Sequence, residues 1–203
     1  MRRAAFCWIA LAILVLDASS SAAQQCREAR YRWSQKIDTT LRGVPAHDVE
    51  ISTILSRWEL PPIGAGKWFR CAPRGGRERM VYGVVGWLRR LERKKDDGDW
   101  HLELTENRGD KVRNCIVVEI PLAELHGDFR QARANLVELL RGTRIDREGD
   151  LEKPVRIRVV GAAFFDGQHL SGSRRPVALE HGRCNSSARA LWEIHPVYRV
   201  ERP

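Results

Sequence analysis

The chain has 203 residues, of which 43% are hydrophobic and 30% are charged, and its formal net charge is +9. This length suits one domain with an appendage, and the absence of an internal repeat or low-complexity tract excludes repeat architectures. The positive charge favours anionic partners such as polysaccharide, phosphorylated lipid headgroups or nucleic acid. However, both signs alternate through most segments, and a mixed, solvated surface explains most of the excess.

Residues 1–23 have the pattern of a secretory signal peptide. A basic start, Met1-Arg2-Arg3, precedes an uncharged apolar run over 4–16, and Ser21-Ala22-Ala23 fits the small-x-small cleavage pattern. The apolar run is shorter than the roughly 20 residues that a membrane-spanning helix needs. We therefore expect an exported protein, periplasmic or extracellular, without a transmembrane span after cleavage. Cleavage removes two Arg and one Asp, so the formal charge falls from +9 to +8.

Export changes how the cysteines are interpreted. Cys7 lies in the signal peptide, and Cys26, Cys71, Cys115 and Cys184 remain in the mature chain. An even number of cysteines in an oxidising compartment predicts two disulfides, with three possible pairings. The alternatives are four free buried thiols or a zinc site, and the second is disfavoured because no CxxC or HxxxH spacing occurs.

Residues 24–75 are predicted to form a helical appendage and linker. Apolar residues recur every fourth position from Ala29 to Leu41, which is typical of a helix. Asp48 can cap a second helix that ends at Pro61-Pro62, and its apolar face should pack on the main domain. That face consists of Ile51, Ile54, Leu55 and Trp58.

Residues 76–203 are predicted to be mainly β with one helix. Three β-rich runs separated by turn residues occupy 81–121, and two further strands are expected over 154–165 and 188–200. Between them, Asp128 should cap a helix that stops at Gly142. The order β-β-β-α-β-β is that of the OB-fold, a five-stranded Greek-key barrel. Closure is favoured because it removes exposed strand edges.

Four short motifs add a resemblance. The sequence resembles a group of exported bacterial OB-fold-like proteins of unassigned function, over roughly residues 80–201. The motifs are D-x-D-x-H-L, E-[IF]-P, V-x-G followed by F-D-x-x-H, and E-[IL]-H-P. The matching residues are Asp97, Asp99 and His101, then Glu119, then Gly161, Phe165, Asp166 and His169, then Glu193, His195 and Pro196. The resemblance implies the fold and assigns no activity.

An OB-fold would place the third and fifth strands side by side and parallel. Cys115 begins the third strand and Cys184 precedes the fifth, so this geometry predicts a Cys115–Cys184 disulfide and leaves Cys26–Cys71 to tie the appendage to the linker.

The alternation of side chains along strands then predicts a polar group on the outer face of the barrel. His101, Glu119 and His195 should meet there, with Asp99 and Glu193 on the same face. The three could bind a divalent metal, form a hydrogen-bonded network that fixes strand register, or be solvated residues aligned by chance. Asp166 and His169 are expected at the opposite end of the barrel.

These features favour an exported, non-enzymatic binding module for an anionic or carbohydrate ligand, with Arg89 and Arg90 as further candidate contacts. The sequence implies no cofactor, although a divalent metal is possible. Nucleic acid is a possible but disfavoured partner, because Trp87, Trp100 and Trp192 are expected in the core rather than exposed for base stacking. The alternatives are a secreted, metal-dependent, nuclease-like hydrolase and a structural envelope protein with a protein partner. The oligomeric state is left open.

Overall fold

The computed structural model describes residues 27–61, 70–93, 97–171, 177–178 and 181–203. The predicted signal peptide lies outside these residues. Within them the protein is mainly β, with few helices, as expected. The strands are β1 (His47–Asp48), β2 (Val81–Glu92), β3 (Trp100–Thr105), β4 (Cys115–Ile120), β5 (Asp150–Phe165), β6 (Leu170–Ser171), β7 (Val177–Ala178) and β8 (Trp192–Glu201). The α-helices are α1 (Trp33–Lys36), α2 (Ile51–Arg57) and α3 (Gly127–Leu139), and short 3-10 turns are η2 (Gly76–Arg79), η3 (Gly167–His169) and η4 (Ala188–Leu191).

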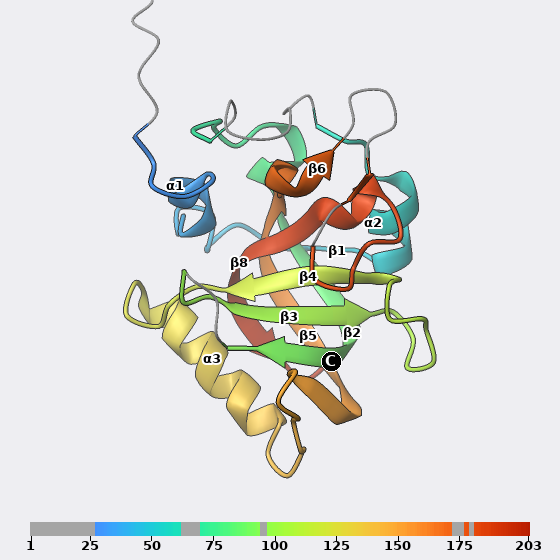
Figure 1. The fold of residues 1–203 in the computed structure, drawn as a ribbon. Helices are drawn as coiled ribbons and strands as arrows, with labels where there is room; N and C mark the ends of the chain where they lie inside the picture. The colour runs from blue at the N-terminus through green and yellow to red at the C-terminus, as the bar shows by residue number, and fades with distance from the viewer. Residues whose placement is uncertain (1–26, 62–69, 94–96, 172–176, 179–180) are drawn as a thin grey trace, which may run out of the picture.

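Six strands form one mixed sheet in the order β1-β2-β3-β4-β8-β5, and β2 also pairs with β5 (Figure 1). The β2–β3, β3–β4, β5–β8 and β2–β5 pairs are antiparallel. The β4–β8 pair is parallel, as predicted for the third and fifth long strands, and Val118 lies opposite Ile194. Strands β2, β3, β4, β8 and β5 therefore each have a partner on both sides.

The core lies on one face of these strands, where apolar residues alternate with polar ones. Leu102 and Leu104 of β3 and Ile116, Val118 and Ile120 of β4 are all at most 1% exposed. The same core takes in Phe129, Ala132 and Leu136 of α3, which packs against β8 and β4. Burial of Phe129 and Leu136, each contributing roughly 1.5–3 kcal/mol when fully removed from water, stabilises the position of the helix on the sheet.

The three tryptophans differ in their surroundings. Trp192 is a core residue, as predicted. Trp100 is half-buried and packs against the core, with the guanidinium groups of Arg93 and Arg133 over its ring. Trp87 is half-buried beneath Arg108 and was wrongly predicted to be a core residue.

The long first helix predicted from Ala29 to Leu41 is wrong, since α1 covers only four residues. Arg32, directly before it, has a left-handed backbone (φ 49°), which interrupts the helix. The Arg32 side chain is fully buried and pairs with Glu78 at 2.6 Å. A contact with distant residues thus overrides the local pattern.

The second helix, α2, is present, although its boundary differs from the prediction. Asp48 lies in β1 and forms an ion pair with Arg158, while Glu50 occupies the N-cap. Ile51, Ile54 and Trp58 of its apolar face are buried in the same core as the sheet.

Elements in the second half match the predictions apart from their ends. Helix α3 begins at Gly127, and the Nδ1 atom of His126, not Asp128, accepts the capping hydrogen bond, from the Asp128 amide. Strand β5 begins at Asp150, four residues before the predicted start. The last strand begins at Trp192, because residues 188–191 form η4.

The predicted Cys115–Cys184 disulfide is confirmed, and both cysteines are buried. Cys71 is disulfide-bonded as well; its predicted partner, Cys26, lies outside the described residues. A buried disulfide is typical of a protein from an oxidising compartment. No helix in the described part of the chain has the length and apolar character needed to cross a membrane.

Candidate functional site

The face of β3, β4 and β8 that points away from the core carries a group of ionisable side chains. His101 of β3 lies directly opposite Glu119 of β4, and its Nδ1 atom is 2.8 Å from Glu119 Oε1. Across the parallel β4–β8 pair, Glu119 Oε2 is 3.1 Å from Nδ1 of His195. The strand register thus brings together the three residues that alternation predicts.

Two more residues extend this group. His195 Nδ1 is also 3.1 Å from Glu193 Oε2, and Glu193 Oε1 is 2.6 Å from Nε2 of His181. The result is an alternating chain of imidazoles and carboxylates, here called the histidine–glutamate chain. Its members, in order, are His101, Glu119, His195, Glu193 and His181.

The histidine–glutamate chain is buried, so the interpretation of its members as solvated surface residues is wrong. His101 is 4% exposed, Glu119 7% and His195 0%. The sheet face is covered by an N-terminal stretch that includes Tyr31 and Lys36, and by residues following β5. Strand alternation alone contains no information about this cover, since both covering segments are irregular.

The surroundings of His195 favour its doubly protonated imidazolium form. Its Nδ1 faces two glutamates, and its Nε2 lies 3.3 Å from Oδ2 of Asp99. Burial alone would lower the pKa of His195, but the three carboxylates outweigh it and raise the pKa well above its ordinary 6.5. An imidazolium has no lone pair for a metal ion, so this arrangement favours the network interpretation over a metal bound by His101, Glu119 and His195 together.

The glutamates of the chain are ionised for the complementary reason. Burial would raise the pKa of Glu119, but hydrogen bonds from His101 and His195 hold it well below its ordinary value. Burial and the neighbouring Glu119 would raise the pKa of Glu193, but the hydrogen bonds from His181 and His195 lower it to about 2. Asp99 behaves differently, since its burial outweighs the contact with His195 and raises its pKa.

Asp166 and His169 lie beside this group, and the prediction that they lie at the opposite end is wrong. Phe164 of β5 pairs with Glu193 of β8, so Asp166, just beyond the end of β5, is next to the start of β8. Its amide donates to the carbonyl of Leu191 at 2.9 Å. The error came from placing the loop after β5 without using the antiparallel β5–β8 register.

A polar cavity of about 430 Å³ opens above the histidine–glutamate chain. Its lining includes four members of the chain (His101, Glu119, His181 and Glu193) and, from the flanking segments, Tyr31, Lys36, Asp97, Asp166 and His169. Lys36 Nζ is 3.2 Å from Oδ2 of Asp166. Burial would lower the pKa of Lys36, but the carboxylates of Asp166, Glu119 and Glu193 outweigh it and raise the pKa.

Tyr31, Lys36 and His181 were missed by the sequence reasoning. Tyr31 and Lys36 lie in the stretch interpreted as a helix, and His181 lies in an irregular segment without periodicity. A weak signal for this side of the cavity was present in Asp166-x-x-His169, a carboxylate and an imidazole directly after a strand.

The other candidate contacts, Arg89 and Arg90, do not line the cavity. Arg89 donates to the carbonyl of Arg108 at 2.9 Å. Arg90 donates to the carbonyl of Glu148 and lies 3.5 Å from Glu103. The structure therefore does not bring these two arginines to the predicted polar group.

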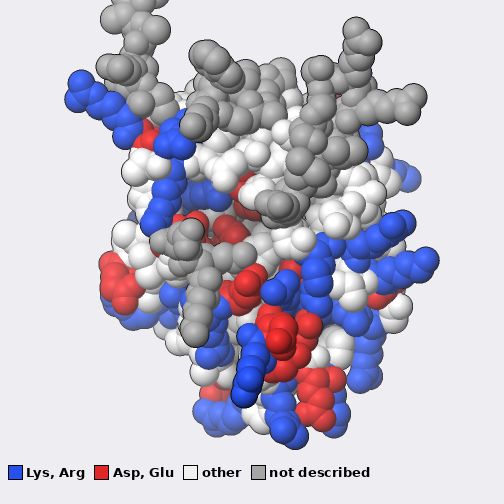
Figure 2. Space-filling view, in the orientation of Figure 1, with Lys and Arg blue, Asp and Glu red and all other residues white. Residues whose placement is uncertain are grey.

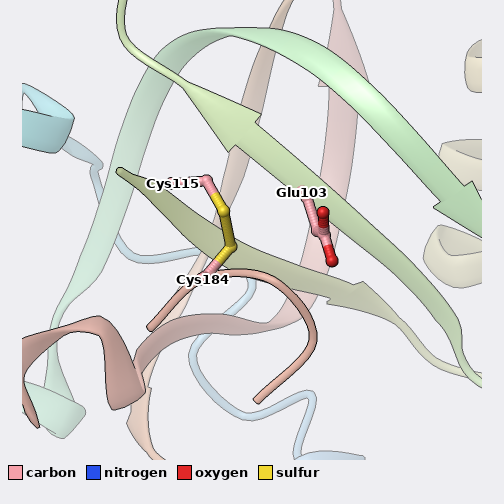
Figure 3. A group of neighbouring side chains, drawn as sticks. All are labelled: Glu103, Cys115 and Cys184. Atoms are coloured by element: carbon pink, nitrogen blue, oxygen red, sulfur yellow. A yellow bond between two sulfur atoms is a disulfide. The ribbon is translucent and has the colours of Figure 1, made fainter. Parts of the chain in front are cut away.

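Glu103, Cys115 and Cys184 form a second group of potential metal ligands on the same sheet face (Figure 3). Because the two sulfur atoms are bonded to each other, they cannot act as thiolate ligands. Glu103 accepts hydrogen bonds from the amide and Nε of Arg183 at 2.9 and 2.8 Å. Its interactions with His101 first and with Arg183 second lower its pKa to about 2 against the effect of burial. This group is structural and fixes the segment after His181 to β3.

The molecular surface carries charges of both signs. Figure 2 shows Lys and Arg interspersed with Asp and Glu over the face in view. Comparison with models of protein families, with curated proteins and with solved structures gives no match.

Proposed function

We propose that the protein is an exported, non-enzymatic binding module whose cavity takes a neutral, hydroxyl-rich ligand such as a mono- or oligosaccharide. In this proposal the strand circuit β2-β3-β4-β8-β5 is a five-stranded OB-fold-like barrel, and the circuit of pairings supports it. The ligand would lie on the broad face formed by β3, β4 and β8, which is a common location for ligands in that fold. The buried disulfide supports export.

The sequence suggests two ligand classes, anionic and carbohydrate, and the charge of the cavity floor favours the carbohydrate. Glu119 and Glu193 have depressed pKa values and are ionised at neutral pH. His195 and Lys36 offset part of this charge, but an anionic ligand would still bring its charge against the two carboxylates in a poorly solvated space, which is costly. Hydroxyl groups instead can donate to carboxylates and accept from imidazoles, so a carbohydrate fits this floor better than an anionic polymer.

One observation carries the proposal: the hydroxyl group of Tyr31 on the cavity wall. Tyr31 is 4% exposed, and among the described residues its hydroxyl has no hydrogen bond within 3.5 Å, the weaker interaction with the Arg32 guanidinium aside. Burial raises its pKa to about 12, so the hydroxyl remains protonated. A buried polar group without a partner costs about 1–3 kcal/mol, and a ligand hydroxyl would recover that free energy. The cavity volume of about 430 Å³ is within the range of small-molecule sites.

The test is isothermal titration of the purified protein with neutral mono- and disaccharides, and in parallel with sulfated and phosphorylated oligosaccharides. Tyr31→Phe should weaken binding of the neutral ligand about 5- to 150-fold, which corresponds to the 1–3 kcal/mol of an unmade hydrogen bond. Tyr82→Phe is the matched control, because the Tyr82 hydroxyl contacts Met80 and Arg77 outside the cavity. Binding of anionic oligomers alone, with steep salt dependence, would overturn the proposal.

A further inference from the structure

Asp166, His181 and Glu193 form a group of potential metal ligands beside the histidine–glutamate chain. One ligand atom from each lies within 4.8 Å of the others, and all three residues are at most 3% exposed. They come from three separate parts of the fold. Asp166 follows the end of β5, Glu193 is on β8, and His181 lies in the irregular segment between β7 and η4. Their convergence is therefore a product of tertiary structure rather than of a local sequence pattern.

His181 provides the observation that points to a ligand. Its Nε2 is 2.6 Å from Glu193 Oε1, while its Nδ1 is buried and has no hydrogen-bond partner among the described residues. With the proton on Nε2, the lone pair of the neutral ring is on Nδ1 and is unused. An imidazole that is oriented by a carboxylate through one nitrogen, with the other nitrogen available, is the usual state of a metal-binding histidine.

His169 adds a second imidazole at the edge of the group. Its Nε2 is 3.9 Å from Asp166 Oδ2, and its ring centroid is 5.5 Å from that of His181. Its side chain is 29% exposed and lines the cavity, which gives solvent a route to the site. Ligands at about 2.0–2.2 Å from a tetrahedral zinc ion are roughly 3.3–3.6 Å apart, so small side-chain movements would bring these atoms to coordination distance.

We propose that Asp166, His169 and the Nδ1 atom of His181 bind one divalent transition-metal cation such as Zn²⁺, while Glu193 orients the His181 ring through Nε2. Two imidazoles and a carboxylate suit Zn²⁺ and its first-row neighbours rather than Ca²⁺ or Mg²⁺, which prefer oxygen ligands alone. The site is separate from His195, whose nitrogens both face carboxylates. Glu193 links the two groups as a hydrogen-bond partner, because Oε2 contacts His195 while Oε1 faces Nε2 of His181.

Lys36 makes the proposal unusually easy to test, since it competes for the same carboxylate. Its ammonium group is 3.2 Å from Asp166 Oδ2 and supplies the positive charge that a metal would bring. A cation bound to Asp166 must displace that contact. Replacing Lys36 by Met removes the competing charge and should tighten metal binding, which is the opposite of what general destabilisation of the cavity would cause.

The experiment is titration of the chelator-treated full-length protein with ZnCl₂ by calorimetry, and with CoCl₂ by visible absorption. We expect one ion per chain, with a Co²⁺ spectrum of nitrogen and oxygen ligation. His181→Ala and Glu193→Gln should weaken Zn²⁺ binding about 10- to 100-fold or more. The matched control is His47→Ala, because His47 is exposed and lies on β1, away from the cavity. Circular dichroism of each metal-free variant checks that it is folded.

His169→Ala gives an independent measurement if the buried variants do not fold, because the partly exposed His169 side chain is the least embedded of the four. It should weaken binding about tenfold, and Lys36→Met should strengthen it. The proposal is overturned if the wild-type protein binds no more Zn²⁺ than its exposed histidines explain. It is also overturned if His169→Ala binds like His47→Ala, or if Lys36→Met weakens binding. Saccharide titrations on the metal-free protein test the proposed function separately.

Discussion

Glu119→Gln removes one negative charge from between two imidazoles without changing the size of the side chain. In the native protein Glu119 Oε1 is 2.8 Å from Nδ1 of His101 and Oε2 is 3.1 Å from Nδ1 of His195, and the residue is 7% exposed. Removing one partner from such a buried ionic group costs about 3–5 kcal/mol, because the remaining charge loses its compensation. For a chain of this size, 1 kcal/mol corresponds to about 2–4 °C in Tm, so Tm should fall by roughly 6–20 °C.

The assay is urea and thermal denaturation followed by circular dichroism at pH 6, where the imidazolium is fully present. The matched control is Glu138→Gln on α3, because Glu138 pairs with Arg141 at the solvent-exposed surface. An exposed pair of this kind contributes about 0.5 kcal/mol or less. A loss below about 1 kcal/mol in Glu119→Gln would refute the reasoning that the charge of Glu119 holds His195 in its ionised form.

Three further predictions concern stability. The Glu193 pKa of about 2, against an ordinary 4.5, stabilises the fold above pH 4.5, and this stabilisation is lost as the pH falls towards 2. The raised pKa of His195 stabilises the fold below pH 6.5 and is lost as the pH rises through the higher folded value, so the free energy of unfolding should be greatest between pH 4.5 and 6.5. Gly161→Ala should cost about 2–3 kcal/mol, since the new Cβ would lie 2.3 Å from the Pro196 carbonyl oxygen. Replacing both Cys115 and Cys184 by Ala should cost about 4 kcal/mol, because the disulfide closes a loop of 69 residues.

Each of these has its own check in urea denaturation. A stability that rises steadily from pH 6.5 to 9 contradicts the account of His195. Gly109→Ala is the control for Gly161→Ala, because a Cβ added at Gly109 would have nothing within 4 Å of it. Equal effects of the two alanine substitutions would remove the steric argument. If the cysteine variant unfolds at the same urea concentration as the wild type, the disulfide does not constrain the unfolded chain.

Strand alternation was sufficient to predict part of the site. A side chain on a strand has only two faces available, so one correct assignment of the core fixes the positions of His101, Glu119 and His195 relative to one another. The parallel neighbours β4 and β8 follow from the order of elements, and with them the Cys115–Cys184 disulfide.

The cover of the site could not be predicted in the same way. Lys36 and His181 reach the cavity from segments without a repeating pattern. The position of Lys36 depends on its contact with Asp166, 130 residues away in the sequence, and that of His181 on its contact with Glu193, 12 residues away. The helix predicted around Lys36 failed for a related reason. Burial of Arg32 against Glu78 fixes a backbone conformation that a helix does not allow.

The N-terminal stretch that covers the cavity is attached to residues 70–78 and, through them and directly, to the last long strands. Arg32 pairs with Glu78, and Arg74 donates to the carbonyl of Gln35. Arg32 donates to the carbonyl of Phe165, and Arg74 donates to the carbonyls of Ala163 and His195 at 2.7 and 3.1 Å. Ribosomes synthesise residues 27–37 before these strands, so the attachment of this stretch is incomplete until β5 and β8 have been made. The cavity is thus completed by the last strand to emerge, and a nascent or truncated chain that stops before residue 192 lacks Glu193 and His195 as well as part of the support for the covering stretch.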